Sequence, residues 1–168
     1  TGSITIGESI YVGDYGVFND ASFVNNTGGT ISVANVSVCG IYANSNTFAN
    51  AGNLTIAAAA LVNASDGTFS NETGGVLNGT GTVQADAFVN NGGYLSPGYS
   101  PGIMTFDGNE DFSNTTFSIE IVGGGGVAGA DFDEIVVNGM AEFGSGPNLN
   151  LEFSFATVDG ATFDIITY

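Results

Sequence analysis

GGYLSPGYSPGIMTFDGNED, residues 92–111, contains the strongest turn signals in the chain. Its opening glycine pair favours a tight turn, because glycine adopts backbone conformations that other residues avoid. Pro97 and Pro101 each lack a backbone donor, so we expect neither within a central strand. Each proline is the centre of a Ser-Pro-Gly triplet, and together the triplets predict two successive turns. Strands are expected on both sides, at residues 94–95 and 103–106, which describes one corner of a coiled sheet.

The composition favours strands over helices. Valine, isoleucine, threonine and phenylalanine are common, whereas the strong helix formers are scarce. Glycine supplies 27 of the 168 residues, about twice its ordinary share. With 43% hydrophobic residues and 13 phenylalanines, the chain can build a core of its own. We expect one all-β domain over residues 1–168.

A Phe-x-Asn element recurs through the first half of the chain. The copies are Phe23-Val24-Asn25, Phe48-Ala49-Asn50, Phe69-Ser70-Asn71 and Phe88-Val89-Asn90, with Phe112-Ser113-Asn114 as a fainter fifth. The successive phenylalanines are 25, 21, 19 and 24 residues apart. A fixed core with variable spacing predicts stacked coils with loops of different length. Each Phe would stack on the next inside, and each Asn would sit at a corner, in a left-handed conformation or in a side-chain ladder.

The segments between these copies predict short strands, as at residues 30–33 and 53–56, with earlier strands at 4–6 and 9–12. IAAAALV, residues 56–62, is rich in alanine but too short and uncapped for a confident helix, so we expect a buried coil with small inward residues. The tail predicts longer strands at 116–122, 134–138, 148–156 and 162–167. Alternation of Leu149, Leu151 and Phe153 there suits a sheet with one wet face that caps the coils.

The region from Gly92 to Tyr168 resembles the autotransporter passenger-associated repeat of bacterial β-helical surface proteins. The likeness rests on three segments. The first is the double Ser-Pro-Gly run, the second is Phe132-Asp133-Glu134-Ile135-Val136-Val137-Asn138-Gly139, and the third spans residues 160–166. In the second segment the family usually has Tyr where this chain has Phe132. The resemblance implies a right-handed parallel β-helix (solenoid) outside the cell, with no catalytic residue. Residues 1–93 are then repeat coils, and residues 94–168 are family-like coils with a more sheet-like C-terminal cap.

The charge balance excludes several classes of partner. The chain has 17 acidic residues and no Lys, Arg or His, giving a net charge of −17. No side chain can neutralise a phosphate, which argues against nucleic acids and anionic membrane surfaces. The sequence shows no apolar run long enough for membrane insertion and no signal peptide. It starts at Thr1, which suggests a processed or excised mature segment. Cationic partners, divalent metals and neutral glycans stay open.

Two acidic clusters are candidate calcium sites. Asp107, Asn109 and Asp111 match the D-x-N-x-D opening of a calcium loop, although the glycine that should follow is missing and Ser118 stands where the loop needs Glu. Asp131 and Asp133 form the second cluster beside a glycine run. The alternative is an ordinary polar turn. No cofactor is required, and calcium is the ion that we consider.

Seven N-x-[ST] sequons are candidate glycosylation sites, if the source glycosylates: Asn25, Asn35, Asn53, Asn63, Asn71, Asn78 and Asn114. They compete with the simpler explanation that Asn and Thr are frequent at coil corners. Cys39 is alone, so it cannot form an internal disulfide, and we expect a buried, inert thiol.

The sequence favours a non-catalytic protein. Without His there is no ordinary general base near neutral pH, and only paired carboxylates among Asp86, Asp107, Glu110 and Asp133 could support a glycosidase. We expect an extracellular or cell-surface structural subunit that self-associates into a filament, sheath or matrix. The alternative is an adhesin or glycan-binding module of a larger surface protein, with aromatic platforms at Tyr11, Tyr15, Tyr42, Tyr94 and Tyr99. A polysaccharide-active enzyme is the least favoured function.

Overall fold

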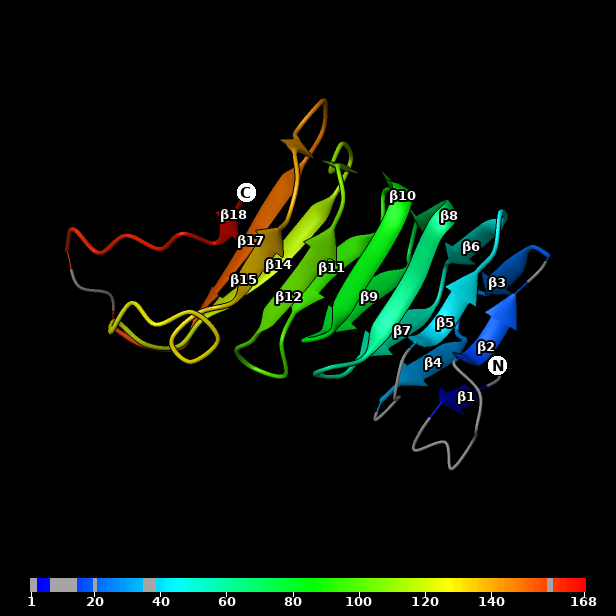
Figure 1. Cartoon of the computed structure of the whole chain (residues 1–168). Coiled ribbons are helices and arrows are strands. Elements are labelled where there is room, and N and C mark those ends of the chain that lie inside the picture. Colours follow the sequence, from blue (N-terminus) through cyan, green and yellow to red (C-terminus); the bar gives the residue numbers. More distant parts are fainter. Residues whose placement is uncertain (1–2, 7–14, 20, 35–38, 157–158) are drawn as a thin grey trace.

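The computed structural model describes residues 3–6, 15–19, 21–34, 39–156 and 159–168, and within them the chain is all-β with no helix. Figure 1 shows the strands ordered along one axis, from β1 near the N-terminus to β17 and β18 near the C-terminus. A seven-stranded sheet contains β1 (Ser3–Ile6), β4 (Thr30–Val33), β7 (Asn53–Ile56), β9 (Val76–Gly79), β11 (Tyr94–Pro97), β14 (Thr116–Ile121) and β17 (Asn148–Phe153).

An eleven-stranded sheet holds the other strands of the described residues. Its main path contains β2 (Tyr15–Asn19), β5 (Cys39–Ala43), β8 (Leu61–Glu72), β10 (Thr82–Asn91), β12 (Ile103–Asp107), β15 (Glu134–Val137) and β18 (Ile166–Thr167). Beside this path lie β3 (Phe23–Asn25), β6 (Thr47–Asn50), β13 (Glu110–Asp111) and β16 (Ala141–Glu142). The long strands β8 and β10 also pair with these shorter ones.

The strands form three parallel columns that the chain visits in a constant order. The first column is the seven-stranded sheet, the second is the main path of the larger sheet, and the third runs β3-β6-β8-β10-β13-β16. We call one visit to the three columns a pass. Because each strand pairs in parallel with the strand of the next pass, equivalent residues of successive passes lie side by side, as Ile31, Leu54 and Leu77 do.

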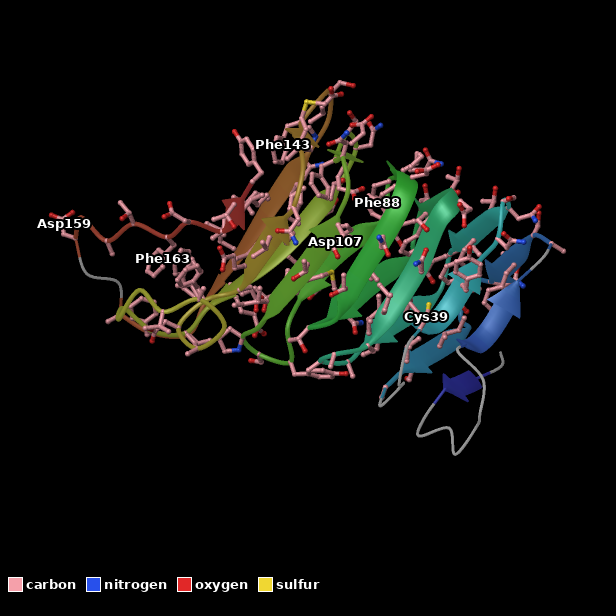
Figure 2. All side chains as sticks on the ribbon, viewed as in Figure 1. Cys39, Phe88, Asp107, Phe143, Asp159 and Phe163 are labelled. Atoms are coloured by element: carbon pink, nitrogen blue, oxygen red, sulfur yellow. The ribbon has the colours of Figure 1, made fainter. Side chains whose placement is uncertain are left out.

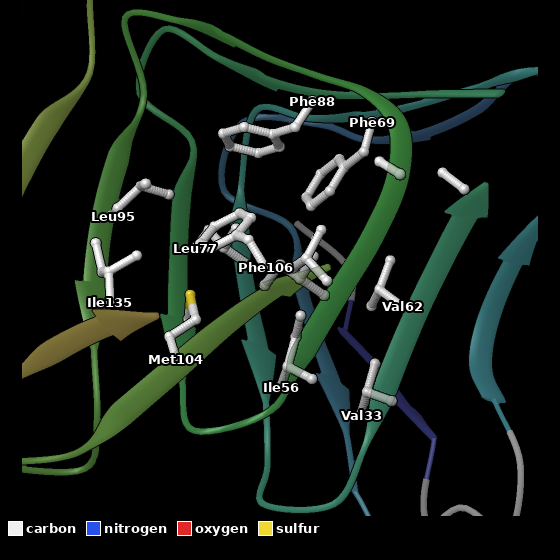
Figure 3. Close-up of a cluster of buried hydrophobic side chains, with 14 of the residues drawn as sticks. Val33, Ile56, Val62, Phe69, Leu77, Phe88, Leu95, Met104, Phe106 and Ile135 are labelled. Carbon is white, nitrogen blue, oxygen red and sulfur yellow. The ribbon is translucent and has the colours of Figure 1, made fainter. Parts of the chain in front are cut away.

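Alternation within each strand separates a core from a polar exterior. In β4, β7 and β9 every second residue is buried, and the residues between them are partly or fully exposed. Figure 3 shows the buried side chains, among them Val33, Leu77 and Met104, filling the interior between the facing columns. The core is therefore one continuous row along the axis, and each pass buries its apolar face against its neighbours.

The phenylalanine ladder expected from the repeats is confirmed for its first four members. Parallel pairing places Phe23, Phe48, Phe69 and Phe88 in register. Their ring centroids are 5.2, 5.0 and 5.4 Å apart in succession, within the range of favourable aromatic pairs. The expected fifth copy is out of register, because Glu110 pairs with Phe88. Phe112 instead packs beside the ladder, with its ring centroid 6.1 Å from that of Phe88.

An asparagine ladder runs two residues beyond the phenylalanines. The Asn25 side-chain amide donates to the Asn50 oxygen at 2.8 Å, and the Asn50 amide donates to the Asn71 oxygen at 2.9 Å. Asn90 continues the column by donating to the Thr115 hydroxyl at 3.0 Å. These four asparagines are buried and none has a positive φ, so of the two expected arrangements the side-chain ladder is confirmed and the left-handed conformation is not found at these positions. Only the fainter copy, at Asn114, has a positive φ, of 58°.

The corner at residues 92–111 differs from expectation at Pro97. This proline is buried and ends β11, which lies between β9 and β14. Its position is tolerated because β14 pairs with β11 only at Tyr94 and Leu95, so no partner on that side requires the missing N–H of Pro97. Residues 98–102 form one bend, with positive φ at Gly98 and Ser100 and a cis peptide before Pro101, and β12 follows as expected.

The alanine-rich segment forms no helix, and of its four alanines only Ala60 points into the core as expected. Residues 57–60 make a turn between β7 and β8, closed by a hydrogen bond from the Ala60 N–H to the Ala57 carbonyl at 3.0 Å. Ala58 and Ala59 are exposed, and Ala59 has a φ of 59°. The reason is that β7 and β8 belong to different columns, so the segment must turn the chain outside the core.

Candidate functional site

The first predicted calcium cluster is not assembled. Asn138 donates to the Asp107 carboxylate at 2.6 Å, the Met140 N–H donates to the Asn109 side-chain oxygen at 3.0 Å, and the Ser113 N–H donates to Asp111 at 2.8 Å. The three predicted ligands thus bind three different partners. Their backbone is two strands joined by a short turn, whereas a calcium loop has to wrap around one ion. Among the described residues no three acidic or other metal-binding side chains are placed to hold an ion together.

The second predicted cluster is also divided. Asp131 accepts a hydrogen bond from the Val127 N–H at 2.9 Å, which closes the glycine-rich loop. Asp133 is buried and accepts from the Gly102 N–H at 2.7 Å and from the Glu120 N–H at 2.8 Å. Burial raises the pKa of Asp133, although the two amides act in the opposite direction. Asp133 therefore ties the Ser-Pro-Gly bend to β14, which makes it a structural anchor.

Glu110 is the residue that sequence reasoning misplaced. It was expected to matter only as one member of a carboxylate pair. In the structure it is 1% exposed and occupies the column position that Phe88 holds in the previous pass. Neither carboxylate oxygen has a hydrogen-bond partner. The sequence carried no signal for this shift, because the 24 residues from Phe88 to Phe112 fall within the 19 to 25 residues that separate the other copies.

The surroundings of Glu110 are acidic and open into a small cavity. A cavity of about 190 Å³ is lined by Asn109, Glu110, Asp111, Met140 and Glu142. Burial raises the pKa of Glu110 to about 7, and the negative charge of Asp107 adds to this effect. By contrast, hydrogen bonds from Ser113 lower the pKa of Asp111, so Asp111 stays ionised at the cavity.

This geometry gives little support to a glycosidase. Of the carboxylates considered for that role, Asp86 is exposed and Asp133 is saturated by backbone amides. The cavity at Glu110 is about 190 Å³, which is smaller than the roughly 300–1,000 Å³ of ordinary small-molecule sites.

The sequons fall into two groups. Asn25 and Asn71 are buried members of the asparagine ladder, so a glycan on either would break the ladder in the folded chain. The remaining described sequon asparagines are half-buried or exposed: Asn53, Asn63, Asn78 and Asn114. Asn63 and Asn78 are nevertheless bonded across strands, to Gln84 at 3.0 Å and to Asn53 at 2.7 Å. Asn35 lies outside the described residues.

Cys39 is buried as expected. Its thiol donates to the Ile41 carbonyl at 2.9 Å, and burial raises its pKa to about 11. Among the tyrosines considered as glycan platforms, Tyr94 and Tyr99 are exposed, and the Tyr42 hydroxyl donates to Asp66. Tyr11 and the side chain of Tyr15 lie outside the described part of the chain.

The last pass ends in an exposed apolar surface. Every residue of β17 is exposed, although Leu149, Leu151 and Phe153 stand in register with the buried Phe117, Ile119 and Ile121. The facing column ends in a strand of two residues, and Leu149, Leu151 and Phe153 remain 49, 42 and 51% exposed. We define the apolar end surface as Met140, Phe143, Leu149, Leu151 and Phe153. Figure 2 shows Phe143 at this end of the molecule.

Comparison with protein-family models, with curated proteins and with solved structures found no match to this chain. Within the described residues, no helix is long and apolar enough to cross a membrane.

Proposed function

We propose that the chain is a non-catalytic structural subunit that stacks end to end with further copies, outside the cell or on its surface. Its three columns would form one right-handed parallel β-solenoid, as in the family that residues 92–168 resemble. The observation that carries the proposal is the apolar end surface on strands whose outer edges are unpaired among the described residues.

The topology makes the N-terminal end of a second copy a suitable partner for the apolar end surface. Among the described residues, each column has one open edge at either end: β17, β18 and β16 at the C-terminal end, and β1, β2 and β3 at the N-terminal end. Since all strand pairing within the columns is parallel, a second copy stacked head to tail would extend each column with unchanged polarity. A head-to-tail contact joins two different surfaces, so every stack keeps one free surface of each kind at its ends. Further copies can therefore add, and the stack grows into a filament.

Charge sets the conditions for assembly. Each copy carries a net charge of −17, so copies repel one another at low ionic strength. At about 0.5 M salt the screening length falls to a few ångströms, and the apolar contact then dominates. As the salt concentration rises, sedimentation velocity and negative-stain electron microscopy should show rods that lengthen. They should lengthen along the axis on which the strands of one copy are ordered in Figure 1.

Two matched variants test whether the apolar end surface mediates the association. Leu151 is 42% exposed at the centre of β17, whereas Val89 is 37% exposed in the middle of the stack. We expect Leu151→Lys to weaken association at least tenfold and Val89→Lys to leave it nearly unchanged. Wild-type protein that stays monomeric at several hundred micromolar in high salt would overturn the proposal. Glycan binding by such monomers would favour the adhesin alternative, for which Tyr94 and Tyr99 offer exposed rings.

A further inference from the structure

Glu110 interrupts the aromatic column of the core. Phe23, Phe48, Phe69 and Phe88 fill this column in four successive passes, and the next pass places a carboxyl group there. Glu110 is 1% exposed, and neither of its side-chain oxygens has a hydrogen-bond partner. A charged carboxylate at such a place loses its hydration without compensation, whereas a neutral carboxyl group loses far less. The packed chain therefore favours the neutral form of Glu110.

The surroundings of Glu110 give an ionised carboxylate no relief. The chain has no Lys, Arg or His that could pair with it. Asp107 of β12 repels it, and the next residues along β13 and β16, Asp111 and Glu142, are exposed acids. β10 places Phe88 beside it, and the buried residues of β11 and β14 are apolar. An ionised Glu110 can therefore be stabilised only by the solvent.

The nearest open end of this column is the C-terminal one. β16 is its last strand among the described residues, and Ala141 of β16 stands in register with Glu110. β13 and β16 have two residues each, so few backbone hydrogen bonds hold them together. The Glu110 N–H donates to the Met140 carbonyl and the Phe112 N–H to the Glu142 carbonyl, both at 2.8 Å. Short strands at an open edge are the parts of a fold that open locally at the lowest free energy.

The same two strands hold part of the apolar end surface. Met140 directly precedes β16, and Phe143 directly follows it. The Met140 N–H donates to the Asn109 side-chain oxygen at 3.0 Å, and the Phe143 ring stacks on that of Phe112 with centroids 5.7 Å apart. Opening of β13 and β16 would therefore displace two of the five residues that define this surface.

We propose that Glu110 gates end-to-end stacking. Its neutral form keeps β13 and β16 packed and the apolar end surface intact, and its ionised form draws both strands toward water and breaks up that surface. This regulation rests on the stacking proposed above. Burial raises the pKa of Glu110 to about 7, with the charge of Asp107 as a second cause. The packed state therefore dominates below about pH 7 and is lost as pH rises through that value.

The first test measures stacking by sedimentation velocity at pH 6 and pH 8, in about 0.5 M salt to screen the net charge. It compares the wild-type chain with Glu110→Gln, which is neutral at both pH values, and with Asp86→Asn. Asp86 is exposed on β10, so its variant removes one charge away from the gate.

The expected change follows from the neutral fraction of Glu110. With a pKa of about 7 this fraction falls from about 0.9 at pH 6 to about 0.1 at pH 8, so the association constants of wild type and Asp86→Asn should fall about tenfold. Glu110→Gln should associate equally well at both pH values. An equal pH dependence in all three proteins would show that overall charge controls stacking, and would overturn the gate.

A second measurement separates the gate from the stacking. At low salt, where the copies repel one another, amide hydrogen exchange in the monomer is followed at pH 6 and pH 8 and corrected for the intrinsic rate at each pH. In wild type at pH 8 the Glu110 and Phe112 amides should exchange almost as fast as in an unfolded chain, and at pH 6 about tenfold more slowly. In Glu110→Gln both should stay protected. The Val76 amide, which donates to the Gly52 carbonyl at 2.8 Å in the middle of the stack, should be protected throughout.

Two results of the exchange measurement would overturn the gate. One is equal protection of the Glu110 and Phe112 amides at both pH values, and the other is a loss at pH 8 that Val76 shares in full. A chain that never stacks would instead contradict the proposed function, and exchange in the monomer would still decide whether Glu110 opens the last pass.

Discussion

Replacing Asn50 tests whether the asparagine ladder holds the passes together. Asn50 is fully buried, accepts from Asn25 at 2.8 Å, and donates to the Asn71 oxygen at 2.9 Å and to the Val76 carbonyl at 3.3 Å. Asn50→Ala removes three hydrogen bonds worth about 1 kcal/mol each, so we expect the free energy of unfolding to fall by about 3 kcal/mol.

Asn50→Asp is the sharper perturbation because it nearly preserves the shape of the side chain. The carboxylate can still accept from Asn25, but it points at the Asn71 oxygen and the Val76 carbonyl, which cannot donate to it. With no cation in the chain, the buried charge stays uncompensated and should cost about 4 kcal/mol or more at neutral pH. The loss should therefore exceed that of Asn50→Ala.

The pH dependence of Asn50→Asp identifies the cause. Burial raises the folded-state pKa of the new carboxyl above its unfolded value of about 3.9. Its contribution to stability is therefore fully present below about pH 4 and is lost as pH rises through the folded-state pKa. Urea unfolding at pH 5 and pH 8, each compared with wild type, should show a smaller deficit at pH 5. Asn150→Asp, on the exposed strand β17, is the matched control and should stay within about 0.5 kcal/mol. A deficit under 1 kcal/mol, or one equal at both pH values, would refute the argument.

Two further predictions concern groups whose pKa the core raises. Burial raises the pKa of Glu110 from 4.5 to about 7, so in the absence of divalent ions its stabilisation of the folded state is fully present below pH 4.5. About 3 kcal/mol of the free energy of unfolding should be lost as pH rises to about 7, at about 1.4 kcal/mol per pH unit. Glu110→Gln should remove this loss from urea unfolding curves, and a variant curve that keeps the wild-type slope would contradict it. Cys39, with a pKa raised from 9.0 to about 11, should react with an aromatic disulfide at pH 8 about 100-fold more slowly than the unfolded chain. Equal rates would mean that the thiol is accessible.

The sequence predicted those features that repeat with the same residue type. Strands β4 and β7 and the stacking of Phe23, Phe48 and Phe69 followed from recurring apolar positions, because a parallel register places equivalent residues together. Register itself could not be predicted where the loop length changes. The short turn at Gly108 and Asn109 brings Glu110 beside Phe88, and no local pattern reveals that shift.

The candidate sites depended on partners that sequence spacing does not specify. Asp107 and Asp111 resemble calcium ligands in sequence, yet strand geometry and local donors give each a different partner. The alternation in β17 correctly indicated a strand with an apolar face. Whether that face is covered depends on the facing column, which shrinks to two residues at β18.

The constant order of three columns makes the pass, rather than the residue, the natural unit of change in length. From Asn50 to Asn71 the chain completes one pass and returns to an equivalent place in the same ladder. An in-frame deletion or duplication of such a segment would join identical environments and leave the ladders on both sides in register. Genes for proteins of this kind can therefore vary the length of the rod by whole passes, while both ends keep the surfaces that they present.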